Sequence, residues 1–304
     1  MRHVLLVLMC LAVAWSATAQ PVTRTIPFGG LTRSFVIHAP ARAQEQDRAL
    51  VVVLHGMGGS GANALEQGRW ATQADKEGFI VVAPEGLAEN PDRPARFFGN
   101  RRSWNSGPAT GSPAQRRGTD DVGFIGAVIA DVQRTHRVDS RRIHVTGFSN
   151  GAAMAFRMGA ERADIIASIA PVANGLLVPV AKLPRPVSLY LVWGAADPLN
   201  PMAGGKVERA GQTIERPSAE ASWRRWAALL NCPGTPSRDR PAPDVTRQAF
   251  AGCDGGSTAS FVSIDGLGHQ WPGGRTYLRI VSGPGSDAFD ATGAIWAFFK
   301  TTAR

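Results

Sequence analysis

The sequence predicts an α/β fold with a mostly parallel central sheet and helices on both of its faces. Residues 49–55 (ALVVVLH) form a continuous run rich in β-branched residues, which is typical of a strand buried on both sides. Similar runs at 79–83, 165–172 and 187–193 alternate with segments of helical periodicity. A chain of 304 residues, 44% hydrophobic and 19% charged, can bury a sizeable core, and no long linker divides it.

The first 19 residues have the features of a signal peptide. Residues 1–3 supply a basic start, residues 4–15 are an apolar run too short to span a bilayer, and residues 17–19 (ATA) match a cleavage site. An uncleaved anchor is the alternative. We therefore expect a secreted or periplasmic protein whose single catalytic domain covers residues 20–304, with no stable membrane insertion after cleavage.

The remaining elements follow in order. Strands are expected at 33–38, 49–55, 79–83, 142–146, 165–172, 187–193 and 261–264. Helices are expected at 62–76, from an N-cap at Thr119 to about 132, at 152–161, at 219–231, and from an N-cap at Ser286 to about 300. Residues 84–118 look irregular, and a loop this long in a compact domain is usually functional. Residues 200–258 are the least regular region.

The net charge of +9 does not indicate a nucleic-acid partner. The basic residues are scattered in pairs such as Arg101-Arg102 and Arg141-Arg142, and no basic run alternates with aromatic residues. We interpret the charge as solvated surface.

Two of the three cysteines, Cys232 and Cys253, lie beyond the signal peptide. An exported chain with two cysteines most simply forms one disulfide, and two buried free thiols are the alternative. No Cys/His spacing in the sequence is typical of a metal site.

The strongest chemical motif is Gly147-Phe148-Ser149-Asn150-Gly151. It follows a predicted strand and opens a predicted helix, which is the context of the G-x-S-x-G nucleophile turn of α/β-hydrolases. In this turn the serine hydroxyl is held at the carboxyl end of the sheet. Ser149 is therefore the predicted nucleophile.

A serine hydroxyl needs a base, and in this fold the acid and then the histidine follow the serine along the chain. His269 is the histidine that follows Ser149, in a glycine-rich loop after the last predicted strand. Asp197 leaves the strand at 187–193 and can fix the imidazole tautomer. Asp265 is the runner-up for the acid. The rivals Asp239, Asp244 and Asp254 lie in polar loops with no strand before them.

An oxyanion hole needs two backbone N–H groups. One is expected from Asn150, directly after the nucleophile. The other is expected from the glycine-rich turn after the strand at 49–55, where Met57 is our choice and Gly58 the alternative. A phosphate-binding loop is disfavoured because no Gly-Lys-Ser/Thr follows.

These motifs, with others in the same order, resemble the polyhydroxybutyrate depolymerase-like esterases, which include feruloyl and acetylxylan esterases of carbohydrate esterase family one. The matching pieces are LHGMGGSG, RRSWNSG, DDVGFIGAVI, RIHVTGFSNGAAMAFRM, LVWGAADPLNP, GLGHQWPGG and IWAFF. They cover most of the chain beyond residue 19. In many members a cysteine stands where this chain has Met57, and no additional polymer-binding domain is recognised, so crystalline polyester is not the expected substrate.

The resemblance implies the α/β-hydrolase fold, the same triad, no cofactor, a Cys232–Cys253 disulfide, and a cleft lined by Trp104 and Asn105. Trp271, beside His269 in sequence, is a further candidate for substrate contact, with a purely structural role as the alternative. The predicted function is a serine esterase acting on short-chain hydroxyalkanoate polyesters or oligomers, or on feruloyl or acetyl esters of polysaccharides. A peptidase or amidase on the same fold, and a binding protein without catalysis, are the other hypotheses.

Overall fold

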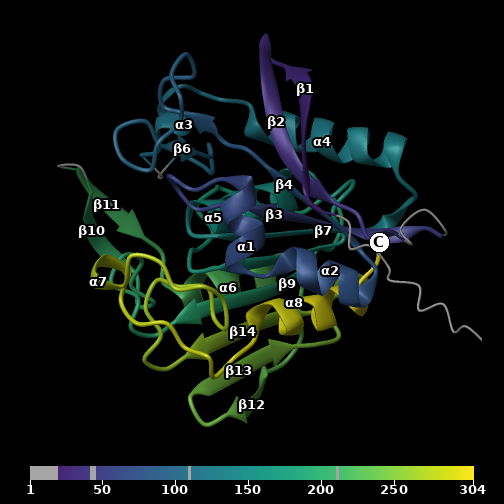
Figure 1. Ribbon diagram of the computed structural model, residues 1–304. Coiled ribbons are helices and arrows are strands. Elements are labelled where there is room, and N and C mark those ends of the chain that lie inside the picture. The colour runs from purple at the N-terminus through teal and green to yellow at the C-terminus, as the bar shows by residue number, and fades with distance from the viewer. Residues whose placement is uncertain (1–19, 42–45, 109–110, 210–211) are drawn as a thin grey trace, which may run out of the picture.

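The computed structural model describes residues 20–41, 46–108, 111–209 and 212–304 (Figure 1). The predicted signal peptide, residues 1–19, lies outside these ranges. Among the described helices, none is both long and apolar enough to cross a membrane.

A ten-stranded sheet runs through the molecule in the order β1-β2-β4-β3-β7-β8-β9-β14-β13-β12. Its central strands β4, β3, β7, β8, β9 and β14 are parallel, and the strands at both edges are antiparallel. The bounds are β1 Val22–Phe28, β2 Leu31–His38, β3 Arg48–Leu54, β4 Ile80–Pro84, β7 Val138–Phe148, β8 Ser168–Val172, β9 Ser188–Gly194, β12 Ser237–Ala242, β13 Val245–Phe250 and β14 Ala259–Ile264.

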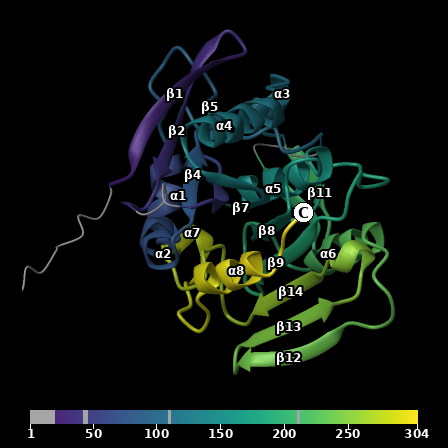
Figure 2. The ribbon, with the colours of Figure 1, turned by 90° about the vertical axis from the view of Figure 1, so that its right-hand side faces the viewer.

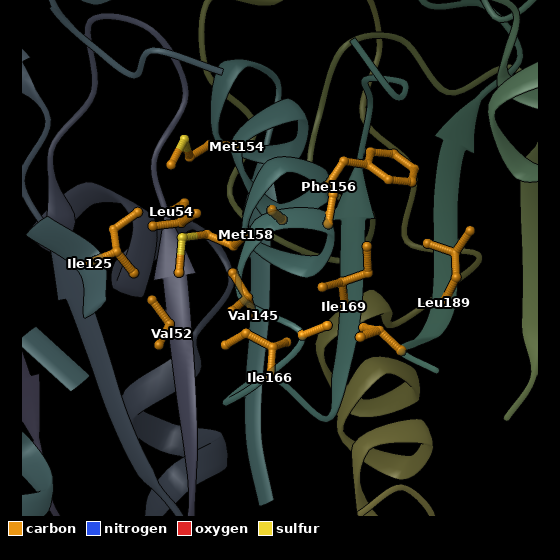
Figure 3. Packing of buried hydrophobic residues seen from close by; sticks show 14 of the residues in the cluster. Val52, Leu54, Ile125, Val145, Met154, Phe156, Met158, Ile166, Ile169 and Leu189 are labelled. Atoms are coloured by element: carbon orange, nitrogen blue, oxygen red, sulfur yellow. The ribbon is translucent and has the colours of Figure 1, made fainter. Parts of the chain in front are cut away.

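Helices cover both faces of this sheet (Figures 1 and 2). One face carries α1 (Gly61–Gln67), α2 (Trp70–Glu77) and α8 (Ala291–Lys300); the other carries α4 (Asp121–Thr135), α5 (Asn150–Glu161) and α6 (Ala219–Leu229). Side chains of β3 point alternately into both layers, because Val52 belongs to the same buried cluster as residues of α5 while Val51 and Val53 belong to the cluster on the other face. Figure 3 shows the second layer, in which side chains of α5 lie against those of β3, β7 and β8.

The helix predictions were right in kind and wrong at several ends. The helix predicted at 62–76 is two helices, because the chain turns at Gly68 and Arg69, where Arg69 has a left-handed φ of +52°. The cap of α4 is Asp120, whose side chain accepts from Gly123 N–H at 2.8 Å, not Thr119. The last helix is capped by Asp290 instead of Ser286.

The regions predicted to be irregular contain paired strands. Between the cysteines, β12 and β13 form a hairpin that extends the sheet beyond β14. A second hairpin, β10 (Gly205–Arg209) with β11 (Gln212–Arg216), stands apart from the main sheet. Short elements occupy the loop at 84–118: β5 (Leu87–Ala88), β6 (Arg102–Ser103) and α3 (Pro113–Arg116).

The predicted disulfide between Cys232 and Cys253 is present. It joins the end of α6 to the chain just before β14, so it closes the base of the β12–β13 hairpin segment, a span of 21 residues. In the chain-entropy model a loop of this size is worth about 3 kcal/mol of stability.

We expect the Cys232→Ala/Cys253→Ala double variant to unfold with a free energy about 3 kcal/mol below that of the parent protein. Urea unfolding of both proteins measures the difference, and reducing the parent with dithiothreitol should reproduce it. Equal stability of parent, variant and reduced parent would contradict the prediction, as would two free thiols found by mass spectrometry after export.

The parallel strands all end at the same side of the sheet. Residues of the predicted site follow these ends directly, since Gly56 and Met57 come after β3, Ser149 after β7, Asp197 after β9 and His269 after β14. In Figure 1 the arrowheads of β9 and β14 point toward the side on which α7 (Arg279–Ser282) lies. This edge is where open α/β sheets hold their sites.

Candidate active site

Ser149 stands in a sharp turn between β7 and α5. Its backbone has φ +54° and ψ −115°, a conformation that side-chain-bearing residues rarely adopt. The N–H of Ser149 donates to Val172 O at 2.9 Å, which ties the turn to the neighbouring strand β8. Because Ser149 is the N-cap residue of α5, its side chain lies at the positive end of that helix dipole.

The glycines on both sides of this turn are required by close packing. A Cβ on Gly147 would lie 2.4 Å from Gly151 O, and one on Gly151 would lie 2.2 Å from Leu54 O at the end of β3. Either side chain would push the turn away from β3. The G-x-S-x-G spacing therefore reflects contacts of the backbone that hold Ser149 in its strained conformation.

His269 lies beside this turn and is bonded to Asp197. Its Nδ1 donates to Asp197 Oδ2 at 2.7 Å, and both residues are buried. The imidazole ring lies 4.7 Å, centroid to centroid, from the ring of Phe148, the residue before Ser149. Asp197 Oδ1 accepts from the N–H groups of Leu199 (2.8 Å) and Asn200 (2.7 Å), so the carboxylate is held from both oxygens.

The other aspartates considered for the acid are engaged elsewhere. Asp265 is exposed, and its N–H donates to Asp244 O at 2.8 Å on the β13–β14 side. Asp239 pairs with Arg247 at 2.7 Å on the β12–β13 hairpin, and Asp254 accepts from Asn231 Nδ2 at 2.6 Å. The geometry thus favours Asp197 over each of its rivals.

The turn after β3 packs directly against the Ser149 turn. A Cβ on Gly56 would lie 3.4 Å from Ser149 Cβ. The N–H of Gly58 donates to Arg102 O at 2.8 Å, so the alternative oxyanion donor is already occupied. Glu85 supports the turn by accepting from Gly61 N–H at 3.0 Å, and Arg102 lies 3.1 Å from the same carboxylate. Met57 remains our choice for the second donor.

The side chain of Asn150 has a task separate from that of its backbone N–H. Its Oδ1 accepts from Trp104 N–H at 2.7 Å, and its Nδ2 donates to Ser106 Oγ at 2.8 Å. These bonds hold the loop after β6 against the start of α5, which keeps the first turn of that helix in place.

Two asparagines that the sequence analysis missed connect the catalytic loops. Asn174 Nδ2 donates to Ser149 O at 3.1 Å, and Asn200 Nδ2 donates to Ala173 O at 2.7 Å. The backbone N–H of Asn200 also donates to Asp197, so one buried residue links the acid to the segment that holds the nucleophile. The available signal was their position, since both follow strand ends at the carboxyl edge.

The structure corrects the prediction that Trp104 contacts substrate. Its side chain has no exposed surface, its Nε1 donates to His55 O at 2.9 Å, and its ring lies 4.9 Å from that of His55. A fully buried indole cannot meet a substrate from solvent. Trp104 instead supports the end of β3, from which the oxyanion turn begins.

The contacts of Trp271 favour the structural alternative over substrate contact. It is 3% exposed, its Nε1 donates to Thr292 Oγ1 at 3.0 Å, and its ring packs edge-on against Trp70. Asn105 is half-buried, and its amide donates to Thr119 O at 2.8 Å while its N–H donates to Asp121 Oδ2 at 2.8 Å. The polar groups of Asn105 therefore hold the loop at 104–121 together.

His55 borders the site but is held as a neutral residue. Its Nδ1 donates to Gly56 O at 2.7 Å, and its Nε2 accepts from Gly86 N–H at 2.9 Å. Burial lowers the pKa of His55 to about 4. Burial likewise lowers the pKa of His144, which stacks on Phe299, to about 3. Neither imidazole is suited to act as a base at neutral pH.

Within the described ranges, no group of three or more His, Cys, Asp and Glu side chains is arranged to hold a metal ion.

Comparison with known proteins identifies esterases and a depolymerase as relatives of this chain. A family model described as phospholipase/carboxylesterase matches residues 34–210. NocK of Nocardia uniformis subsp. tsuyamanensis, named as an esterase, is 30% identical over 283 residues, which is 86% of this chain and 77% of NocK. Feruloyl esterase B of Piromyces equi is 28% identical over 74% of this chain, and poly(3-hydroxyalkanoate) depolymerase C of Paucimonas lemoignei is 27% identical over 57%. The aligned part is 40% of the former and 38% of the latter.

Solved structures share the fold. An acetyl xylan esterase from Aspergillus awamori superimposes with a TM-score of 0.58 at 16% identity, covering 82% of this chain and 94% of that one. A thermostable esterase gives a TM-score of 0.53 at 13% identity, over 94% of this chain and 64% of that one. The predicted α/β-hydrolase fold and the predicted resemblance to feruloyl esterases, acetylxylan esterases and polyhydroxyalkanoate depolymerases are both confirmed.

Proposed function

This chain belongs to the phospholipase/carboxylesterase family and is a carboxylic ester hydrolase, and from this premise we propose that Ser149, His269 and Asp197 are its catalytic triad. The observation that carries the proposal is the double contact of His269. Its Nδ1 donates to Asp197 at 2.7 Å, and its ring lies against Phe148 in the turn that carries Ser149.

In the proposed reaction Ser149 Oγ attacks the ester carbonyl carbon while His269 Nε2 accepts the hydroxyl proton. The negative charge on the carbonyl oxygen is stabilised by the N–H groups of Asn150 and Met57. His269 then gives its proton to the leaving alcohol, and an acyl-enzyme remains. Water, deprotonated by His269, attacks this intermediate and releases the acid. Asp197 keeps Nδ1 protonated throughout and stabilises the imidazolium that forms.

We further propose that the chain acts after export, as one catalytic domain of residues 20–304. The basic, apolar and small-residue segments of residues 1–19 support this proposal. The Cys232–Cys253 disulfide also supports it, because such bonds persist in oxidising compartments.

The proposed substrates are esters with short acyl or hydroxycinnamoyl groups, in hydroxyalkanoate oligomers or on polysaccharides. Two relatives carry the names of a feruloyl esterase and a poly(3-hydroxyalkanoate) depolymerase, which supports these classes. The loops at 84–118 and 266–275 are rich in Arg, Asn, Ser, Pro and Gly, which does not favour a long apolar groove for fatty acyl chains.

We expect kcat/KM for p-nitrophenyl esters to be highest with acetyl to butyryl groups and to fall by about tenfold or more toward palmitoyl, since the composition of the loops at 84–118 and 266–275 does not favour a groove for the longer chain. Methyl ferulate and a hydroxybutyrate oligomer should also be hydrolysed. A rate that rises steadily to long acyl chains would contradict the proposed substrate class.

Trp104→Phe serves as the matched control in this series. Because Trp104 is buried against His55, we expect the variant to have a lower thermal stability. Its kcat/KM should change by the same factor for every substrate. A change in the order of substrate preference would mean that Trp104 does contact the acyl group.

A further inference from the structure

Exposed apolar side chains are concentrated beside the candidate active site. In the described part of the chain, eight large hydrophobic residues are exposed, and six of these lie in two short segments. One segment is the Phe97–Phe98 pair. The other, which we call the apolar tip, is residues 277–281, in which Ile280 is 102% exposed, Val281 59% and Leu278 49%. Clustered apolar exposure of this kind marks a contact surface.

The apolar tip is attached to the loop of His269. The N–H of His269 donates to Ser282 O at 2.6 Å, directly after the tip. Gln270, almost fully buried, donates from Nε2 to Tyr277 O at 2.8 Å and accepts at Oε1 from Tyr277 N–H at 3.1 Å. The backbone of the tip is thus held in place while its side chains face solvent. Figure 1 shows α7, which contains most of the tip, at the side where the parallel strands end.

The Phe97–Phe98 pair is attached to the proposed oxyanion turn. A Cβ on Gly58 would lie 3.0 Å from the ring of Phe97, and the two phenyl rings contact each other with centroids 4.8 Å apart. The same turn approaches Ser149 through Gly56. The pair is therefore attached to the proposed oxyanion turn, and the tip is attached to the loop of His269.

We propose that the apolar tip and the Phe97–Phe98 pair form a docking surface for the apolar surface of a water-insoluble ester, so that the substrate is taken from an aggregate or particle. This inference rests on the proposed function, because it assumes that Ser149 is the reacting group. The occupant follows from these attachments: the two segments are fixed to the loops that carry His269 and the proposed oxyanion turn, and the molecule that must reach Ser149 is an ester. Such docking needs no separate polymer-binding domain.

Adsorption to emulsified tributyrin tests the proposal, with every protein carrying Ser149→Ala so that hydrolysis does not change the droplets. We expect Ile280→Ser/Val281→Ser to lower the affinity for droplets by about tenfold, the loss of partly buried contacts of two aliphatic side chains. Phe98→Ser should also lower the affinity for droplets. The control Val22→Ser/Leu31→Ser removes two exposed aliphatic side chains from the β1–β2 edge of the sheet and should bind as the parent does.

The proposal would be overturned if Ile280→Ser/Val281→Ser and Phe98→Ser adsorbed to droplets as well as the parent. It would also be overturned if the control lost as much affinity for droplets as these variants. Binding of the parent to phosphatidylglycerol vesicles, lost in Ile280→Ser/Val281→Ser while droplet binding is kept, would assign the surface to a membrane instead. A concentration-dependent dimer that the same variant abolishes, again with unchanged droplet binding, would assign it to a second copy of the chain.

The experiment separates this inference from the proposed triad. With Ser149 intact, the ratio of the rates on tributyrin droplets and on dissolved p-nitrophenyl acetate should fall about tenfold in Ile280→Ser/Val281→Ser. A Ser149→Ala protein that still hydrolysed p-nitrophenyl acetate would contradict the triad, but it would leave the adsorption result standing. Thermal unfolding of each variant checks that the tip substitutions leave the fold intact.

Discussion

Ser149→Ala should lower kcat/KM for p-nitrophenyl acetate by about 10⁴- to 10⁶-fold, because the members of a triad act as a unit and little catalysis remains without the nucleophile. The change removes one oxygen atom from a half-buried residue, so thermal unfolding should stay close to that of the parent. Steady-state rates with purified protein, together with a melting curve, measure both quantities. Activity within tenfold of the parent would rule out Ser149 as nucleophile.

His269→Ala is the companion to this variant. It should lower kcat/KM about as much as Ser149→Ala does. The double variant should be no slower than either single variant, because one substitution already removes the catalysis that the triad supplies. His136→Ala is a matched control: His136 follows α4, and its Nδ1 lies 2.9 Å from Thr135 Oγ1, in a contact that involves none of the proposed triad. Its rate should equal that of the parent. A large loss in His136→Ala, or additive losses in the double variant, would contradict the proposed mechanism.

Asp197→Asn should lower kcat by about 10⁴-fold, because an amide at this position can donate to Nδ1 and so favours the wrong tautomer of His269. The substitution keeps the shape of the side chain, and its Oδ1 can still accept from Leu199 and Asn200. The measurement is kcat with a soluble ester, with a melting curve to show that the protein folds.

Asp265→Asn is the control that separates the two candidate acids. Asp265 is exposed and lies at the β13–β14 side, so its variant should keep the parent rate. If Asp265→Asn were the more damaging of the two, the acid would be misassigned and the Asp197–His269 hydrogen bond would be structural only.

Local patterns in the sequence were sufficient to predict the central sheet and the candidate nucleophile. Runs such as 49–54 are apolar at every position, and only a strand covered on both faces buries all of them. Gly147-Phe148-Ser149-Asn150-Gly151 is a local motif, because the turn needs small residues within five positions, and the structure shows the contacts that require them. The choice of His269 and Asp197 used the order of residues along the chain, and the structure brings these two side chains, 72 positions apart, to 2.7 Å.

Features that depend on contacts between distant segments were decided only by the tertiary structure. The sequence shows a tryptophan at 104 but not that its indole is buried against His55 at the end of β3, so its predicted substrate contact was wrong. The sequence favoured Met57 as the second oxyanion donor with Gly58 as the alternative, and the bond from Gly58 N–H to Arg102 O supports that order. The exposure of the apolar tip is decided by the fold, because residue type alone does not distinguish an Ile280 and a Val281 in solvent from buried ones. Residue type and spacing thus determined the strands, the nucleophile turn and the order of the triad, whereas burial, hydrogen-bond partners and exposure depend on which surfaces the folded chain brings together, and a linear pattern does not contain that information.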